Sequence, residues 1–278
     1  MIKMAKSPYN PLMKNLSIFL IRKAHRFRMA IIKRTISPDV LALRIWSISK
    51  YIQVRKVIGF DLTRIGGSGD GGYVMLDNFQ NIEGVLSLGV GPDVSWDLDM
   101  NRRTPLIHLY DHSILKLPKN IPNGTWFKEK IVSKSHSTGT AFEIAVQRLP
   151  NSSNLILKCD IEDSEWEIFA QCSTKTLSKF DQILIEFHWL TEKFFNEKYE
   201  LMVAALENLS RTHSVVNIHG NNYADYEMIG NCPVPSVIEI SYARTKSYKF
   251  EEKPNSKNLN APNDQKRPEI SLSFPIVL

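Results

Sequence analysis

Cysteine is scarce in this sequence, with three residues in 278 and no pair in a CxxC spacing. So sparse and odd a set excludes a disulfide framework and a zinc–cysteine site, and it predicts a reducing compartment and a cytoplasmic location. Long apolar runs are also absent. Because no segment has about 20 consecutive uncharged apolar residues, we expect no helix that crosses a bilayer.

Acidic residues are missing from the first 38 positions, which hold nine Lys or Arg. This segment therefore carries +9, and the rest of the chain sums to about −3. We predict a basic helical N-terminal arm over residues 1–50, in which residues 14–34 mix basic and apolar side chains. Its apolar run, Leu16–Ile21, is short for a signal peptide.

Two interpretations of the arm stay open. A basic helix with an apolar stripe suits an anionic membrane surface, so the arm is a candidate for peripheral membrane contact. Alternatively, the stripe packs on the domain and leaves the lysines in water. Aromatic residues interleaved with basic ones are few, so we expect no nucleic-acid partner.

Short apolar runs alternate with helix-like segments from about Gly84 to Ala243, which predicts a parallel sheet with crossover helices. The chain length fits one large domain, which we place at 51–250. The last two runs are joined by a loop without helix signals, so we expect them to pair antiparallel. Residues 251–278 begin with many Lys, Asn, Pro and Glu and predict a flexible C-terminal tail. The seven expected strands are 84–90, 105–111, 125–132, 154–161, 182–188, 213–220 and 236–243.

Glycines and an acidic residue at the ends of the first two strands predict a nucleoside site. Ligands of open α/β sheets bind outside the carboxyl ends of the strands. Gly89 and Gly91 allow a tight turn close to a ligand. Asp111 ends the second strand twenty positions after Gly91, where it can accept hydrogen bonds from ribose hydroxyls.

The residues after this turn select the kind of nucleoside. No third glycine follows to seat a pyrophosphate on a helix N-terminus, and the carboxylates of Asp93 and Asp97 would repel phosphate. A nucleoside with a positive charge and no phosphate fits better. The pattern therefore favours S-adenosylmethionine as the cofactor.

Several stretches resemble the FkbM-type S-adenosylmethionine-dependent methyltransferases, over roughly Arg64 to Arg244. The most specific is "KCDIEDSEWEIF", which is similar to the family signature K-x-D-[IV]-E-G-x-E, with Asp163 where the family usually has Gly. The other stretches are "RIGGSGDGGYVM", "SLGVGPDVSWDLDM", "HLYDHS", "ILIEFHWL", "VVNIHGNNY" and "PSVIEISYAR".

The resemblance implies a Rossmann-like class I methyltransferase fold, with a seven-stranded, mostly parallel sheet and an antiparallel last strand. It implies O-methylation of a sugar hydroxyl, on a glycan or glycolipid precursor or another small molecule. Carried over by position, Gly89 and Gly91 lie under the amino-acid end of the cofactor and Asp111 holds its ribose. Asp160 and Glu162 face the cofactor and the acceptor.

Polar residues at the later strand ends are the candidates for catalysis. Methyl transfer to a hydroxyl needs a base for the proton that the attacking oxygen loses. His188 and His219 end the fifth and sixth strands, and we expect them at adjacent strand mouths. We expect Asp160 or Glu186 to orient the catalytic histidine.

The same residues also allow a metal hypothesis. Asp160, Glu162, Glu186, His188 and His219 form a mixed oxygen and nitrogen set that could bind a divalent cation and polarise a sugar diol. Spacing along the chain does not establish a metal site across separate strands. A divalent cation is therefore the alternative to metal-free acid–base catalysis.

The stretch Arg64–Phe79 places five glycines within seven positions. No Lys followed by Ser or Thr opens a helix after them, so a phosphate-binding loop is not predicted. We expect the loop to fold over the cofactor or the acceptor, with Arg64 and Asp70 as polar contacts. A plain hairpin turn is the alternative.

Two other functional classes remain. One is a different nucleotide-dependent Rossmann enzyme, such as an oxidoreductase or a sugar-nucleotide enzyme, although no Tyr-x-x-x-Lys pair lies in a suitable helix. The other is a noncatalytic scaffold. The many polar strand ends argue against a scaffold, because an idle site has no need of so many carboxylates and histidines.

Overall fold

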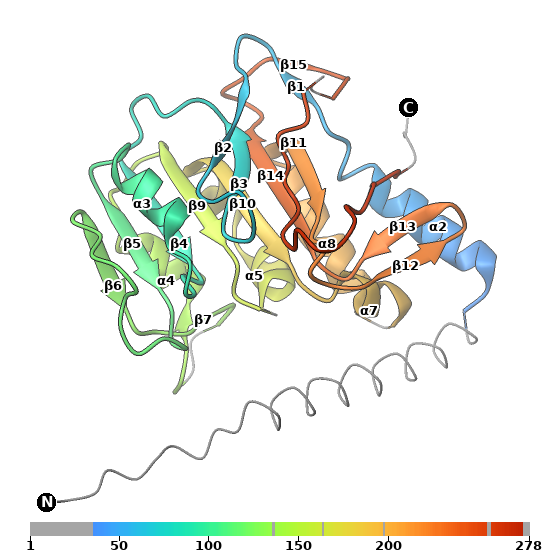
Figure 1. Cartoon of the computed structure of the whole chain (residues 1–278), viewed down its shortest axis with the longest axis horizontal. Coiled ribbons are helices and arrows are strands. Elements are labelled where there is room, and N and C mark those ends of the chain that lie inside the picture. Colours follow the sequence, from blue (N-terminus) through green and yellow to red (C-terminus); the bar gives the residue numbers. More distant parts are fainter. Residues whose placement is uncertain (1–35, 135–136, 163, 197, 255–256, 275–278) are drawn as a thin grey trace, which may run out of the picture.

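A seven-stranded sheet runs through the protein (Figure 1), whose computed structural model describes residues 36–134, 137–162, 164–196, 198–254 and 257–274. The strand order is β11-β14-β10-β9-β4-β5-β6. Strand β14 is antiparallel to both of its neighbours, and the other neighbouring pairs are parallel. This is the predicted class I methyltransferase fold, and the antiparallel pairing of the last two strands is confirmed. The strands are β4 (Gly84–Leu88), β5 (Ile107–Tyr110), β6 (Gly124–Phe127), β9 (Leu155–Cys159), β10 (Phe180–Phe187), β11 (His213–Gly220) and β14 (Ile238–Arg244).

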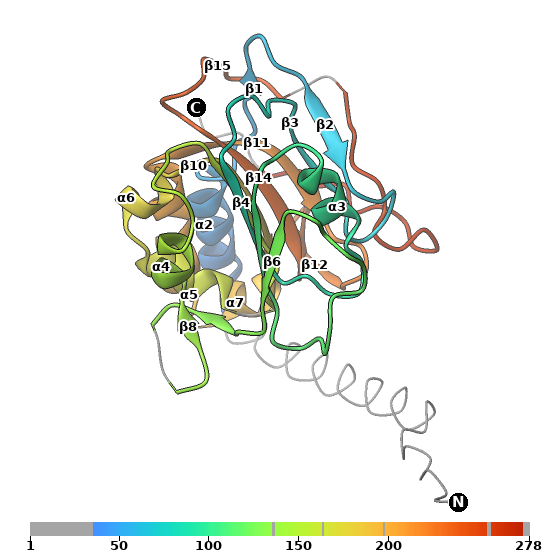
Figure 2. The ribbon, with the colours of Figure 1, turned by 90° about the vertical axis from the view of Figure 1, so that its left-hand side faces the viewer.

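Both faces of the sheet are covered, which explains why β4, β9 and β10 are buried along their whole length and mostly apolar. Figure 2 shows helices on one face and, on the other, helix α3 (Ser95–Asn101) with the hairpin of β2 (Leu62–Ile65) and β3 (Tyr73–Leu76). The helices of the first face are α2 (Pro38–Ser49), α4 (Phe142–Gln147), α5 (Glu165–Gln171), α6 (Thr174–Leu177), α7 (Leu190–Phe195) and α8 (Tyr199–Ser210).

Helix α2 belongs to the domain, so the predicted boundary at residue 50 is too late. Pro38 occupies the first turn, and the Ser37 hydroxyl accepts a hydrogen bond from the Val40 amide at 3.3 Å. Ile45 and Ile48 are buried in the main core. The basic segment 14–34 lies outside the described residues.

The chain after Glu251 packs against the sheet, so the prediction of a flexible tail is wrong for the described part of this segment. Ile270 is buried and forms a β-bridge with Gly220 on the edge strand β11. Asn260 exchanges hydrogen bonds with Asn217 of the same strand. Composition did not reveal this packing, because the partners that satisfy these polar side chains lie far away in the sequence.

The remaining strands form small two-stranded sheets outside the main one. They are β1 (Lys56–Val57) with β15 (Phe250–Glu251), β7 (Ile131–Val132) with β8 (Thr140–Ala141), and β12 (Tyr226–Ile229) with β13 (Cys232–Pro235). None of the described helices is long and apolar enough to span a membrane.

Buried His213 makes the stability of the fold depend on pH. Its Nε2–H donates to the Phe180 carbonyl at 3.0 Å, and burial lowers the pKa of the imidazole to about 4. The unfolded chain therefore binds a proton below about pH 6.5 that the folded chain does not bind. The contribution of neutral His213 to stability is complete above that pH and is lost as the pH falls.

We predict that lowering the pH from about 7 to about 5 reduces the free energy of unfolding by about 2 kcal/mol through protonation of His213 in the unfolded chain. Urea denaturation of wild type and His213→Gln at both pH values measures this reduction. The variant should show a smaller pH-dependent loss by about this amount. An equal loss in both proteins would contradict the assignment.

Candidate functional site

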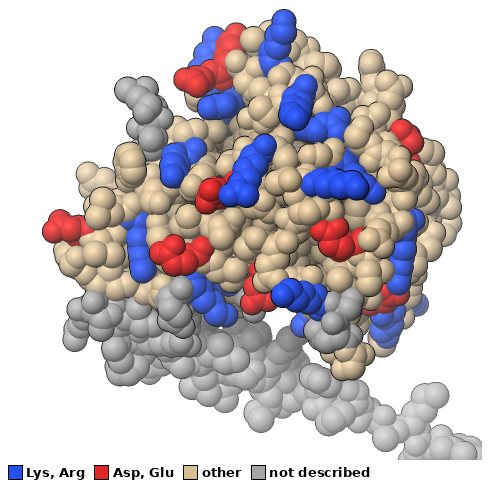
Figure 3. Space-filling view, turned by 180° about the vertical axis from the view of Figure 1, so that it is seen from behind, with Lys and Arg blue, Asp and Glu red and all other residues tan. Residues whose placement is uncertain are grey.

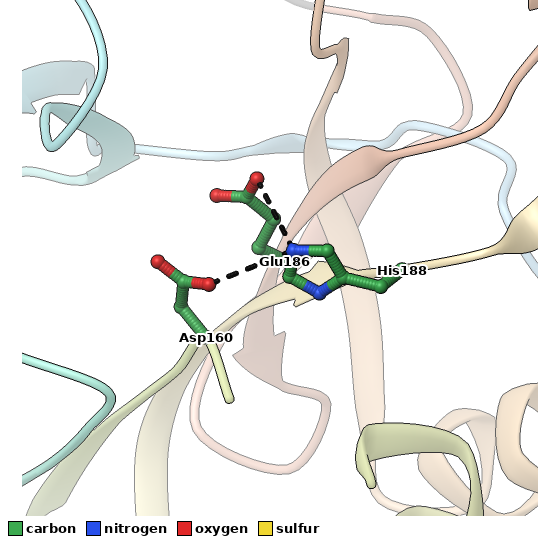
Figure 4. A group of neighbouring side chains, drawn as sticks. All are labelled: Asp160, Glu186 and His188. Carbon is green, nitrogen blue, oxygen red and sulfur yellow. Dashed lines mark ion pairs between the residues drawn. The ribbon is translucent and has the colours of Figure 1, made fainter. Parts of the chain in front are cut away.

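Three predicted site residues meet at the carboxyl ends of β9 and β10. Asp160 follows β9 directly, Glu186 lies in β10 and His188 follows β10 (Figure 4). These two strands are parallel neighbours, so residues at their ends are brought together. One ligand atom from each residue lies within 4.8 Å of the others.

The imidazole of His188 is held by a residue that the strand-end argument missed. Its Nδ1 lies 2.9 Å from Oε1 of the fully buried Glu165, and that oxygen also accepts a hydrogen bond from the Ile161 amide. The orienting partner is therefore Glu165, and the expectation of Asp160 or Glu186 is wrong. Helix α5 begins at Glu165, so the helix start after β9 carries this contact.

Nε2 of His188 points into the acidic cluster without a close partner. The nearest described carboxylate oxygens belong to Glu162 at 3.6 Å and to Asp160 and Glu186 at 3.8 Å each. These separations exceed a hydrogen bond. This nitrogen therefore faces a space bordered by three carboxyl groups.

Two donors from distant segments hold the carboxyl groups in place. The Tyr73 hydroxyl lies 3.0 Å from Oε2 of Glu186 and 3.2 Å from Oδ2 of Asp160. The Asn221 amide donates to Oε1 of Glu186 at 2.8 Å. A tyrosine has a single proton, so it donates to one carboxylate at a time. Tyr73 thus links the β2–β3 hairpin to the strand ends.

Negative charge dominates the electrostatics of the cluster. Burial raises the pKa of Asp160 to about 6, and burial together with the neighbouring acids raises the pKa of Glu186. Burial would lower the pKa of His188, but the hydrogen bond to Glu165 and the nearby carboxylates outweigh it and raise the pKa to about 10. A histidine with this pKa is protonated at neutral pH and does not serve as a base.

His219 lies in a neighbouring acidic group, which Glu239 joins to Glu186 across β14, and the expectation that the strands of His188 and His219 are adjacent is wrong. Strand β14 lies between β10 and β11, so the two strand ends are not adjacent in the sheet. Nδ1 of His219 is 3.1 Å from Glu239, and its Nε2 is 3.1 Å from Glu269. Both nitrogens are therefore used in hydrogen bonds.

Asp70, predicted as a cofactor contact, joins this second group. Its carboxylate accepts a hydrogen bond from Asn263 at 3.2 Å, and the same amide donates to Glu239 at 2.7 Å. The C-terminal segment thus occupies the contact that we expected a ligand to make.

The glycine turn after β4 has two differently placed residues, both with positive φ. A Cβ on Gly89 would lie 1.5 Å from the Asp160 carbonyl oxygen, so Gly89 lets β9 come close rather than a ligand. The Lys158 ammonium donates to the Gly89 carbonyl at 2.7 Å and holds the turn. A Cβ on Gly91 would meet no atom within 4 Å, so the space beside Gly91 is open.

Asp111 lies where it was predicted, but protein donors surround its carboxylate. One oxygen accepts from the Val90 and Gly91 amides, and the other accepts from the amide and hydroxyl of Ser113. Despite burial, these hydrogen bonds lower the pKa of Asp111. Its role toward ribose stays a prediction.

Asp93 and Asp97, which we expected to repel phosphate after the glycine turn, lie in different environments. Asp97 is fully buried and accepts a hydrogen bond from the Ser87 hydroxyl at 2.5 Å, so it belongs to the interior. Asp93 caps the start of α3 through the Ser95 amide at 2.8 Å. The argument against phosphate therefore no longer includes Asp97.

The glycine-rich stretch is the ordered turn of the β2–β3 hairpin. The Arg64 guanidinium donates to the carbonyls of Gly67 and Gly69, and the amides of Gly66 and Gly67 donate to Asp99 and Ser95. The loop is thus anchored to α3. Its contact with a cofactor or acceptor stays a prediction.

Strained backbone flanks the acidic cluster. Glu162 and Trp189 have φ values of 68° and 59°, in the left-handed region that non-glycine residues rarely adopt. Each follows a cluster residue closely in the chain. Such strain gathers at functional sites, where the surrounding structure maintains it.

The site residues that the strand-end argument did not predict differ in how strongly the sequence indicates them. Lys158 and Glu165 both belong to the stretch "KCDIEDSEWEIF", so the family signature already contained them. Tyr73 follows the glycines of the hairpin and carries no signal of its own. Asp163, the departure from the signature, lies outside the described residues.

Comparison with protein-family models gives no match, and no curated protein matches the chain. Among solved structures, the chain is similar to an rRNA methylase from Streptococcus thermophilus, at 9% identity and a TM-score of 0.37 over 58% of this chain and 86% of that one. It is similar to the fibrillarin pre-rRNA processing protein of Methanococcus jannaschii, with 11% identity and a TM-score of 0.38, over 68% of this chain and 84% of that one. It is also similar to a Streptococcus mutans protein assigned as a methyltransferase and solved with SAH, with 8% identity and a TM-score of 0.32, over 58% of this chain and 86% of that one. These similarities are weak, and the strand order itself defines the fold.

The two glycines of the turn after β4 should differ in their tolerance of a side chain. Gly89→Ala should lower the free energy of unfolding by about 2–4 kcal/mol, because its Cβ overlaps the Asp160 carbonyl. Gly91→Ala, with a similar positive φ but open space, should cost about 1 kcal/mol. Urea denaturation of both variants measures the difference. Equal losses would contradict the close packing of Gly89 on β9.

Proposed function

We propose that the protein is an S-adenosylmethionine-dependent methyltransferase of the FkbM type that O-methylates a sugar hydroxyl on a glycan or glycolipid precursor. The observation that carries the proposal is the strand order, with the antiparallel β14 inserted between β10 and β11. This order is that of the class I methyltransferase fold. The stretch from Lys158 to Glu165 supports the family.

The nucleoside part of the cofactor fits the ends of β4 and β5. Gly91 borders open space, and Asp111 lies beside it. A hollow of about 320 Å³ is lined by residues 128–130, by residues 137–140 and by His112, the residue that follows Asp111 in the chain. Its size is that of a small-ligand pocket. We place the adenosine there, with ribose hydroxyls replacing the Ser113 hydroxyl on Asp111.

The charge of the cofactor fits the acidic cluster. Asp160, Glu162 and Glu186 lie beyond the glycine turn, and a sulfonium next to them gains favourable electrostatic energy. A pyrophosphate in the same place would be repelled. This difference supports S-adenosylmethionine over the dinucleotide of an oxidoreductase.

The reaction that fits is an in-line displacement at the sulfonium methyl. The acceptor oxygen forms a bond to the methyl carbon while the carbon–sulfur bond breaks, and its electron pair stays on sulfur to give neutral S-adenosylhomocysteine. The hydroxyl proton passes to a carboxylate. We assign this role to Glu162, whose side chain is 80% exposed and within reach of an entering acceptor.

A sugar acceptor is supported by exposed aromatic side chains that closely follow His188 and Asn221 in the chain. Trp189 follows His188, and Tyr223 lies two residues after Asn221; both are exposed. Apolar ring faces with a few polar groups nearby are typical of small-molecule sites. A sugar has both an apolar face and hydroxyls, so it matches this combination.

We also propose a cytoplasmic protein that contacts the membrane at its N-terminal side. Leu43 and Trp46 of α2 are 66% and 54% exposed, and the basic segment 14–34 precedes them in the chain.

On the face that Figure 3 shows, Lys and Arg are interspersed with Asp and Glu, so this described surface offers no continuous basic patch for nucleic acid.

The cofactor is tested by calorimetry with S-adenosylhomocysteine. The full chain should bind it and not bind NAD. Asp111→Asn should weaken binding by about tenfold or more, because each lost charge-assisted hydrogen bond is worth about 1.5 kcal/mol or more. Ser113→Ala, the matched control, should change the affinity little, because it frees an acceptor position on Asp111.

The reaction is tested with labelled S-adenosylmethionine and a panel of sugar acceptors. Label in a methyl ether of a sugar supports the proposal. Binding of NAD in place of S-adenosylhomocysteine would indicate the other Rossmann class, and absence of binding by either would indicate a scaffold.

Membrane contact is tested by co-sedimentation with vesicles of phosphatidylserine and phosphatidylcholine. The full chain should partition more than a chain lacking residues 1–35, and more than Leu43→Ser/Trp46→Ser, and salt should weaken its binding. Vesicles of phosphatidylcholine alone are the control. Equal partitioning of the three proteins would contradict the role of both segments.

A further inference from the structure

His188 is the decisive residue of the acidic cluster because one of its nitrogens is fixed by a hydrogen bond and the other is directed at carboxylates beyond hydrogen-bond distance. Its side chain is only 8% exposed, and Nε2 has no described carboxylate oxygen closer than 3.6 Å. A nitrogen directed at several oxygens at this distance leaves room for an atom between them. Figure 4 shows the three side chains converging on that space.

We propose that Asp160, Glu186 and His188 bind a divalent metal ion, and that this ion holds the hydroxyls of the acceptor. The role toward the acceptor rests on the proposed function. The metal site itself does not depend on that function, because it rests on the geometry of the three side chains.

The separations within the group suit a single ion. Nε2 of His188 lies 3.8 Å from Oδ1 of Asp160 and 3.8 Å from Oε1 of Glu186. Two donors at about 2.1 Å from one ion are about 3 Å apart when adjacent and about 4.2 Å apart when opposite. The observed distances fall between these values, so small side-chain shifts suffice.

Surrounding groups orient all three candidate ligands toward the same point. Glu165 accepts the Nδ1–H of His188, which leaves Nε2 as the coordinating nitrogen once the ion displaces the proton that Nε2 carries at neutral pH. Metal-bound histidines commonly have such a carboxylate partner. The Tyr73 hydroxyl binds Oδ2 of Asp160 and Oε2 of Glu186, so the other oxygen of each faces Nε2.

The charge balance also favours a cation. Four carboxyl groups surround His188, from Asp160, Glu162, Glu165 and Glu186. The buried Lys158 ammonium is directed to the Gly89 carbonyl instead of to this space. The charges of Lys158 and protonated His188 offset part of the repulsion among these carboxyl groups, and a divalent ion would offset more of it.

His219 provides an internal comparison. It too is a buried histidine between carboxylates, but Glu239 and Glu269 lie within 3.1 Å of its two nitrogens. No nitrogen remains there for a metal. His219 therefore belongs to a group closed by hydrogen bonds, whereas His188 keeps one nitrogen for a ligand.

One imidazole and two carboxylates are typical ligands of Mn²⁺ or Mg²⁺, with the nitrogen favouring Mn²⁺. Three protein ligands leave coordination positions for two oxygens of a vicinal diol. A coordinated hydroxyl loses its proton more easily, which would assist attack on the methyl group. The acceptor class that follows is a sugar with neighbouring hydroxyls.

The site is tested by binding of Mn²⁺ alone to the full chain after chelation, followed by electron paramagnetic resonance and by thermal unfolding. We expect saturable binding of one ion and a rise in the unfolding temperature. His188→Gln should abolish both effects, and His219→Gln, the matched control, should retain them. Glu165→Gln should weaken Mn²⁺ binding by about 10–100-fold while the protein stays folded.

Absence of saturable binding to the wild type would overturn the metal site. So would unchanged binding in folded His188→Gln, or equal losses in the His188 and His219 variants. Calorimetry with S-adenosylhomocysteine separates this result from the proposed function. Mn²⁺ binding without S-adenosylhomocysteine binding supports the metal site and rejects the methyltransferase, whereas the reverse result rejects the metal site alone.

Discussion

Repulsion among buried carboxyl groups at the ends of β9 and β10 is the constraint around which the site is built. Asp160 and Glu186 lie close together, and burial and neighbouring charge raise the pKa of both. Tyr73 and Asn221 supply hydrogen bonds, and Glu165 holds His188 beside them. Such an arrangement costs folding free energy, and this cost is one reason for proposing a chemical role for it.

The groups that manage this charge come from segments far apart in the chain. The β2–β3 hairpin contributes Tyr73, and the loop after β11 contributes Asn221. The C-terminal segment contributes Asn263 and Glu269 to the second acidic group, around His219. These segments lie at the carboxyl ends of the strands, where Glu239 of β14 pairs with both Glu186 and His219, so the two acidic groups are neighbours. The group around His219 is closed by hydrogen bonds, whereas Nε2 of His188 has no described carboxylate oxygen within hydrogen-bond distance.

The proposed cofactor and acceptor regions lie at the ends of different strands along the same edge of the sheet. The proposed cofactor region is at β4 and β5, where Gly91 leaves open space and Asp111 orders the turn. The proposed acceptor region is at β9 and β10, where carboxyl groups and strained backbone lie close together in the chain. A methyl donor between the two regions has its positive charge next to the carboxylates. The proposed metal ion would lie on the acceptor side of that arrangement.

The sequence by itself determined most of the strands and their approximate ends, because mostly apolar runs fit a doubly covered sheet. The expected strand 125–132 is the exception, since β6 ends at Phe127 and residues 131–132 belong to a separate small sheet. The sequence also placed Asp160, Glu186 and His188 at strand ends, and neighbouring parallel strands bring such residues together. It could not place His219, since that depends on β14 entering between β10 and β11, a pairing made through long-range contacts. It also predicted a flexible tail where Asn263 and Ile270 are held by partners distant in the chain. Local pattern therefore determined which residues end the strands, while only the tertiary structure decided which of them meet, because contacts between distant segments are not encoded in spacing.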